Sequence, residues 1–173
     1  MNWPDIQGWM DGEDLDWLYN MASQMKSVVE IGSWKGRSTY ALCSGCKGPV
    51  YAVDHWNGSP SQLYSQHSEA QYRDIYQDFI ENVGHFSNLK IMRMDSVEAS
   101  KHFAPGSVDA VFIDGEHTYE SVLSDLKAWY PIKNKLICGH DIYMESVVKA
   151  IKDFGIRYKV EEGHIWREQE GRQ

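Results

Sequence analysis

The chain has 173 residues, which is enough for one domain with a sizeable core and few for two. Its 25 acidic and 17 basic side chains give a net charge of −8 without a visible lysine or arginine cluster, so nucleic acid is not an expected partner. No apolar run is long enough for a bilayer and the first residues show no secretory pattern, so no membrane partner is expected and the expected location is cytoplasmic.

The first part of the chain alternates between helical and strand periodicity. Residues 3–10 form an aromatic, turn-rich arm. After it, the pattern predicts in chain order a helix at Gly12–Met25, a strand at Ser27–Ile31, a helix at Gly36–Ser44 and a strand at Pro49–Asp54. The polar segment His55–Ala70 follows, and its length favours a functional or partly mobile loop.

The same alternation continues through the rest of the chain. It predicts, in chain order, a helix at Gln71–Asn82, a strand at Leu89–Met94, a short helix at Val97–His102, a strand at Val108–Ile113, a helix at Tyr119–Tyr130, a strand at Lys135–Gly139 and a helix at Met144–Phe154. Two short stretches, Tyr158–Glu161 and His164–Arg167, predict a closing hairpin.

Strands that alternate with helices predict a parallel sheet with helices on both faces. The expected fold is therefore a Rossmann-like, doubly wound α/β domain, with an antiparallel C-terminal hairpin at one edge of a mostly parallel sheet. We expect residues 1–173 to form this single domain. Residues 1–25 are expected to be an arm and helix that cover a site or form an interface, such as a homodimer contact.

Acidic residues stand at or beside the ends of the predicted strands. They are Glu30, Asp54, Asp95, Asp114 and Asp141, the last preceded by His140. In a parallel sheet the carboxyl ends of the strands share one edge, which is where ligands bind. Because like charges repel, such a row of acids predicts a binding function at this edge.

A glycine-containing turn connects the first strand to its helix. Gly32 would let the backbone approach a ligand, and free N–H groups at the helix start would face a carboxylate. Asp54 follows Gly32 by 22 residues, where an acid can accept hydrogen bonds from two ribose hydroxyls. A nicotinamide cofactor would use the same acid. However, Trp34 takes the place of the middle glycine in Gly-x-Gly-x-x-Gly, which disfavours a pyrophosphate.

Three segments, taken in order, resemble a known family: Glu30–Thr39, Phe112–Val122 with Asp125-Leu126 after it, and Gly139–Asp141. They are similar to the signatures of class I methyltransferases, in the group that contains macrolide-sugar O-methyltransferases and proteins labelled cephalosporin hydroxylases. The resemblance covers most of the chain. It implies methyl transfer from S-adenosylmethionine to a hydroxyl of a sugar or small natural-product acceptor. Asp125 itself is expected on the outer face of its helix, as a solvated charge.

The resemblance implies a set of cofactor-binding residues, which comprises Glu30, Gly32, Ser33, Gly36, Asp54, Asp95, Ser96 and Asp114. Within this set, Glu30 and Gly32 would contact the methionine part of the cofactor, and Asp54 would hold the ribose. Asp95 and Ser96 would lie by the adenine, although Asp95 could equally be only a cap for the next helix.

The resemblance also implies that Asp114 and His117 are catalytic. Metal-dependent members have acids at the positions of Asp114, His140 and Asp141 and use a histidine base at the position of His117. The resemblance therefore implies a divalent ion, Mg or Mn, at Asp114, His140 and Asp141 of this chain. His140 departs from that pattern, and imidazole is more typical of Zn, Mn or Fe than of Mg. Glu116 is a competing base by position. Two simpler interpretations stay open: the acids cap loops without a metal, and His117 only holds its loop.

Two functions of other classes also stay open, because a fold does not determine a function. One is an NAD(P)-dependent oxidoreductase on the same fold. The other is a cofactor-binding module without catalysis that serves as a partner subunit.

Overall fold

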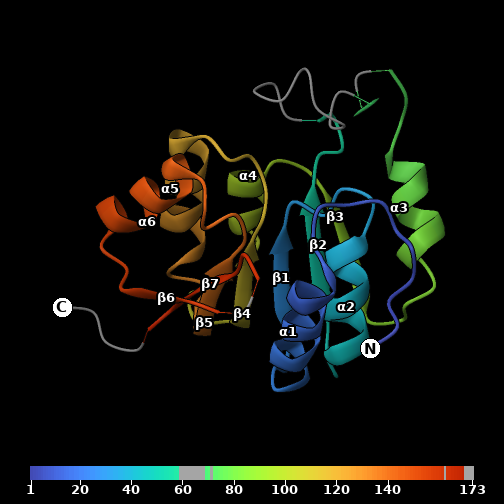
Figure 1. The fold of residues 1–173 in the computed structure, drawn as a ribbon, viewed down its shortest axis with the longest axis horizontal. Helices are drawn as coiled ribbons and strands as arrows, with labels where there is room; N and C mark the ends of the chain where they lie inside the picture. The colour runs from blue at the N-terminus through green and yellow to red at the C-terminus, as the bar shows by residue number, and fades with distance from the viewer. Residues whose placement is uncertain (59–68, 71, 162, 170–173) are drawn as a thin grey trace.

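The computed structural model describes residues 1–58, 69–70, 72–161 and 163–169. Within these residues the centre is a seven-stranded sheet with the strand order β3-β2-β1-β4-β5-β7-β6 (Figure 1). The strands are β1 (Val28–Ile31), β2 (Val50–Asp54), β3 (Leu89–Arg93), β4 (Val108–Ile113), β5 (Lys133–Gly139), β6 (Tyr158–Val160) and β7 (Trp166–Glu168). β1 to β5 run parallel, whereas β7 is antiparallel to both β5 and β6. The predicted Rossmann-like α/β fold is confirmed.

The helices of the described residues are α1 (Gly12–Ser23), α2 (Arg37–Gly45), α3 (Tyr76–Val83), α4 (Ser96–Ser100), α5 (Tyr119–Trp129) and α6 (Glu145–Phe154). α1 packs on α2, while α5 packs on α4 and α6, and Figure 1 shows these two groups on opposite sides of the sheet. None of these helices combines the length and the apolar character that a membrane crossing requires.

Helices on both faces bury every residue of β1 and β4. The side chains of alternate residues in each strand point to opposite faces of the sheet. Val29 and Val111 belong to the core beneath α5 and α6, whereas Val28 and Phe112 belong to the core beneath α1 and α2. This two-sided burial fixes the register of the two strands, so that both end at the same edge of the sheet.

α3 begins at Tyr76, later than the predicted start at Gln71. The side chain of Asp74 accepts a hydrogen bond from the Tyr76 backbone N–H at 3.1 Å, and such local bonds favour a helix start over helix continuation. The predicted loop at His55–Ala70 lies mostly outside the described residues.

The C-terminal hairpin is present, and its second strand lies slightly later than predicted. β7, rather than β6, joins the parallel part of the sheet, where Trp166 pairs with Gly139. A Cβ atom at Gly139 would lie 2.4 Å from the Ile113 carbonyl oxygen and 2.8 Å from the Trp166 ring. The ends of β4, β5 and β7 therefore pack together without room for a side chain at this point.

We expect Gly139→Ala to lower the free energy of unfolding by about 1–3 kcal/mol, because the added methyl group meets backbone and a fully buried ring. Denaturant unfolding measures this change. Gly12→Ala is the matched control, since nothing lies within 4 Å of its added methyl group. A Gly139→Ala variant as stable as the parent chain would contradict the tight packing described here.

Candidate functional site

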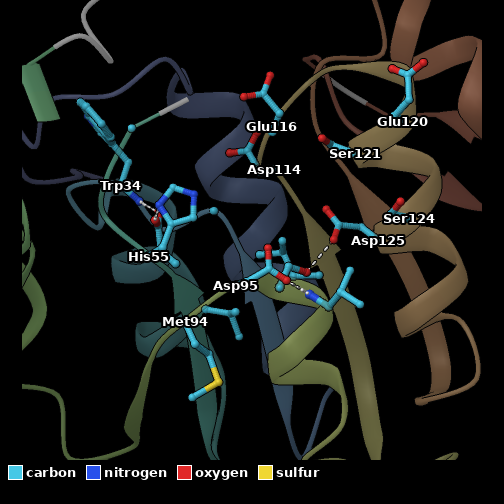
Figure 2. A pocket seen from close by; sticks show the side chains of 18 residues that line it. Trp34, His55, Met94, Asp95, Asp114, Glu116, Glu120, Ser121, Ser124 and Asp125 are labelled. Atoms are coloured by element: carbon cyan, nitrogen blue, oxygen red, sulfur yellow. Dashed lines mark hydrogen bonds and ion pairs between the residues drawn. The ribbon is translucent and has the colours of Figure 1, made fainter. Parts of the chain in front are cut away.

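Two neighbouring cavities open at the carboxyl ends of the parallel strands. The larger, of about 370 Å³, is lined by the ends of β1 to β4 and by the first part of α5 (Figure 2). The smaller, of about 250 Å³, is lined by arm residues 7–10, the turn after β1 and the segments that follow β4 and β5. Gly32, Trp34 and Asp114 line both, so the two cavities meet at these residues.

The larger cavity is acidic. Its acidic lining residues are Asp54, Asp95, Asp114, Glu116, Glu120 and Asp125, and the described residues that line it include no lysine or arginine. Figure 2 shows the last five of these acids around one space, carried by the end of β3, the segment after β4 and α5. Such a cavity attracts a ligand that carries positive charge.

The turn after β1 is held in place by close backbone contacts. Gly32 has φ +84° and packs so closely that a Cβ atom there would lie 2.2 Å from the Asp114 carbonyl oxygen. Trp34 occupies the position at which a Gly-x-Gly-x-x-Gly motif has its middle glycine, and its φ is +46°. Asp54 Oδ2 accepts hydrogen bonds from the backbone N–H groups of Ser33 and Trp34, at 3.0 and 2.9 Å. The acid at the end of β2 therefore shapes this turn as well as lining the larger cavity.

Glu30 lies behind the turn and lines neither cavity. Its buried Oε2 accepts hydrogen bonds from the hydroxyls of Ser33, at 2.7 Å, and Thr39, at 2.5 Å. Burial raises the pKa of Glu30 to about 7. Gly36 also lines neither cavity and begins α2 with φ +91°. Both residues adjoin the turn without lining a cavity. The contact of Glu30 with the methionine part of a cofactor, which the resemblance implies, stays a prediction.

At the far end of the larger cavity, Asp95 caps α4 by accepting the backbone N–H groups of Val97 and Glu98. Ser96 Oγ donates to Asp125 Oδ1 at 2.6 Å. The expectation that Asp125 is a solvated charge is wrong, because its side chain is buried and lines this cavity. Burial raises the pKa of Asp125 to about 6, although the bond from Ser96 opposes that effect.

Two acids and two histidines meet at the smaller cavity. His117 Nε2 lies 2.7 Å from Asp141 Oδ2 and 3.9 Å from Asp114 Oδ1. His140 Nδ1 lies 3.4 Å from Asp141 Oδ1 and 3.6 Å from Asp114 Oδ1. The predicted approach of Asp114 and Asp141 at the sheet edge is confirmed.

The arrangement of Asp114, His140 and Asp141 fits a divalent cation. One ligand atom from each residue lies within 4.8 Å of the others, and all three side chains are largely buried. Carboxylate oxygens suit Mg and Mn, and imidazole suits heavier ions of the first transition row. Asp141 adopts φ +57°, a conformation that non-glycine residues rarely take and that concentrates at functional sites.

The charges of His117 and Asp141 stabilise each other, whereas burial and the charge of Asp141 raise the pKa of Asp114. Burial alone would lower the pKa of His117, but its interactions with Asp114 and Asp141 outweigh burial and raise the pKa to about 10. Burial would raise the pKa of Asp141, yet the hydrogen bonds from His117 and His140 hold it well below its usual range. In this arrangement His117 is an imidazolium at neutral pH, so the ordinary pKa near 6.5 expected for a free base does not apply.

The sequence did not single out Asp14, which is fully buried beside this cluster. Asp14 Oδ2 lies 3.3 Å from His140 Nε2. The one sequence signal near it, Asp11-Gly12-Glu13-Asp14, forms a capping box that starts α1. That pattern predicts a helix start and carries no information about a site.

The arm also lines the smaller cavity, through residues 7–10. The rings of Trp9 and Trp34 lie 5.8 Å apart between centroids, and both line this space. Arg37 holds the arm, since its Nε donates to the Met10 carbonyl oxygen at 2.7 Å. The residues before α1 thus form one wall of the smaller cavity.

A family model described as a methyltransferase domain matches residues 29–142. This range contains most of β1, all of β2 to β5 and the segments that follow them. Among curated proteins, an uncharacterized protein of Sinorhizobium fredii is 26% identical over 121 residues, which is 66% of this chain. The chain spans 12% of the length of that relative.

Solved structures share the fold. An SAH-bound methyltransferase from Podospora anserina is similar with a TM-score of 0.63 and 14% identity, covering 92% of this chain and 78% of that one. An O-methyltransferase from Bacillus cereus in complex with SAH gives a TM-score of 0.62 and 16% identity, covering 95% of this chain and 83% of that one. At these identities the likeness concerns the fold alone.

The raised pKa of His117 makes the stability of the metal-free protein depend on pH. A group whose pKa is raised in the folded state stabilises it fully below the unfolded value, here 6.5, and loses that effect as the pH rises through about 10. We therefore expect the free energy of unfolding, measured with a chelator present, to fall between these two pH values.

His117→Asn should make this decline in the free energy of unfolding shallower. Part of the decline should persist in the variant, because the pKa of His140 is raised in the same way. The exposed His102, changed to Asn, is the control. If His117→Asn declines as steeply as the parent chain, the ion pairs of His117 do not contribute as described.

Proposed function

Because the chain belongs to the methyltransferase-domain family, matched over residues 29–142, we propose that it transfers a methyl group from S-adenosylmethionine to a hydroxyl oxygen of a sugar or small natural-product acceptor. One observation carries the proposal. An acidic cavity and a cavity with two histidines and two aspartates meet at Gly32, Trp34 and Asp114. Cofactor in the first and acceptor in the second would bring the methyl group and the hydroxyl together at that junction.

The proposed cofactor cavity is the larger one. The sulfonium and amino group of S-adenosylmethionine are cationic, and the acids that line this cavity favour such charges. When bound, this cofactor supplies a methyl group whose bond to sulfur breaks as the bond to oxygen forms, leaving a neutral thioether. Asp54 is the proposed ribose acceptor, and Asp95 and Ser96 are proposed to lie by the adenine.

An NAD(P)-dependent oxidoreductase is not favoured. A pyrophosphate carries negative charge, and the acids of the larger cavity would repel it, with no lysine or arginine among the described lining residues to offset them. The side chain of Trp34 also stands where a dinucleotide-binding turn has its middle glycine. A cofactor-binding module without catalysis differs from an enzyme in one measurable way, since it would bind the cofactor and show no turnover.

The smaller cavity is the proposed acceptor site. Trp9 and Trp34 offer flat apolar surfaces to the acceptor, and Asp141 and His117 offer polar groups to its hydroxyl. A divalent cation held by Asp114, His140 and Asp141 would neutralise the two acids and orient and acidify that hydroxyl.

In the proposed mechanism, His117 accepts the proton that the hydroxyl loses as its oxygen attacks the methyl group. His117 can do so only if its acidic partners are neutralised, because their charge now keeps it protonated. The base and the cation site are therefore proposed to work together. Glu116 lines the larger cavity and is not among the residues that line the smaller one.

Asp54→Ala should weaken cofactor binding by about 1–3 kcal/mol, because it removes the proposed ribose acceptor and the carboxylate that shapes the turn after β1. Calorimetry with S-adenosylmethionine, its demethylated product and NAD measures this. A Kd of about 1 μM corresponds to about −8 kcal/mol. Asp74→Asn, an exposed acid away from both cavities, is the control. Saturable NAD binding without heat from the other two ligands would rule the proposal out.

His117→Ala should lower kcat by roughly 10²–10⁴, the usual loss when a general base is removed, while cofactor affinity stays unchanged. Single-turnover methyl transfer and cofactor binding, measured on the same variant, test both parts. The exposed His102, changed to Ala, should leave both unchanged. A normal transfer rate in His117→Ala would remove this residue from catalysis, and lost cofactor binding would make its role structural.

A further inference from the structure

Carboxylates lie at both ends of the His140 ring. Nδ1 lies 3.4 Å from Asp141 and 3.6 Å from Asp114, whereas Nε2 lies 3.3 Å from Asp14 Oδ2. The exposed fraction is 3% for the His140 side chain and 0% for that of Asp14. Water therefore has little access to the ring, and its neighbours determine which nitrogen keeps a proton.

Asp14 is fixed in this position from two directions. Its Oδ1 accepts a hydrogen bond from the His164 backbone N–H at 2.9 Å, and its Oδ2 accepts one from the Asp11 backbone N–H at 3.2 Å. Gly163 packs against the carboxylate, since a Cβ atom there would lie 2.1 Å from Oδ1. α1 and the turn before β7 together keep Asp14 facing His140.

We propose that Asp14 is a positioning residue that keeps the ring proton of His140 on Nε2, so that the Nδ1 lone pair faces a divalent cation shared with Asp114 and Asp141. A carboxylate behind a ligand histidine fixes its tautomer and orientation and makes it a stronger ligand. With imidazole in place of a third carboxylate, the site prefers Mn²⁺ to Mg²⁺. This inference rests on the proposed function and deepens it by specifying the cation.

A second arrangement of ligands uses the opposite side of the ring, where Asp14, His140 and His164 also have ligand atoms within 4.8 Å of one another. It is less favourable because both oxygens of Asp14 already accept backbone N–H groups. The His164 side chain is also 48% exposed. His164→Ala distinguishes the two arrangements, since it should leave cation affinity unchanged only in the proposed one.

The test titrates Mn²⁺ and Mg²⁺ separately into the full chain by calorimetry, and it records the nitrogen coupling of bound Mn²⁺ by electron spin echo spectroscopy. The decisive variant is Asp14→Asn, which keeps the shape of the side chain. The His164 N–H, which makes the shorter of the two backbone bonds to Asp14, keeps the amide oxygen in the place of Oδ1. The amide nitrogen then replaces Oδ2, gives up the bond from the Asp11 N–H and donates to His140 Nε2. The ring proton then moves to Nδ1 and blocks the ligand position.

We expect Asp14→Asn to weaken Mn²⁺ binding about 10–100-fold and to remove the nitrogen coupling. Asp11→Ala is the matched control, because it removes the α1 cap without touching His140 and should leave Mn²⁺ affinity unchanged. The double variant Asp14→Asn/His140→Asp keeps the charge of the pair and restores an oxygen ligand. It should bind Mn²⁺ without nitrogen coupling and should lower the preference for Mn²⁺ over Mg²⁺.

Equal affinities of the parent chain for both cations, or an unchanged nitrogen coupling in Asp14→Asn, would overturn the inference. So would a parent chain that binds neither cation. If that chain still binds S-adenosylmethionine and transfers a methyl group, the proposed function stands without the cation. If it instead binds Mn²⁺ with nitrogen coupling but does not bind S-adenosylmethionine, the cation site stands and the proposed function fails.

Discussion

Asp114 and Asp141 follow neighbouring parallel strands, and the pairing of β4 with β5 holds their carboxylates close together. Two negative charges in a largely buried place destabilise the fold unless positive charge lies beside them. In the absence of a bound cation, His117, on the segment after β4, and His140, at the end of β5, provide that charge. The arrangement of the smaller cavity therefore follows from electrostatic compensation at one point of the sheet edge.

The need to balance these buried charges also explains why segments distant in sequence meet at the smaller cavity. A histidine buried between carboxylates needs both ring nitrogens satisfied, and α1 supplies Asp14 for the nitrogen that faces away from the cavity. Asp14 in turn needs donors, and the backbone of Asp11 and His164 supplies them. The antiparallel hairpin is thus part of the support of the site as well as an edge of the sheet.

Much of the fold could be predicted because its signals are local. Strand and helix periods, and acids at strand ends, depend on residues next to one another in sequence, and Asp114 and Asp141 were found in this way. His117 was singled out by the resemblance to a known family. Asp14 could not be found, because its partner His140 lies 126 residues away. Asp125 was misjudged because a helical period does not reveal that Ser96, from another helix, bonds to its carboxylate in the folded chain. The start of α3 depended on one side chain, Asp74, competing for a backbone N–H group.

The hydrogen bond from His164 to Asp14 joins residues 150 positions apart, which affects how the protein is made. The ribosome synthesises α1 well before this part of the hairpin, so Asp14 lacks the hydrogen bond from His164 until the hairpin has been made. During that interval β1 to β5 can assemble, but the charge cluster at their edge lacks its final support. A nascent chain is therefore expected to form the parallel part of its sheet before Asp14 is fixed against His140 at the edge of that sheet.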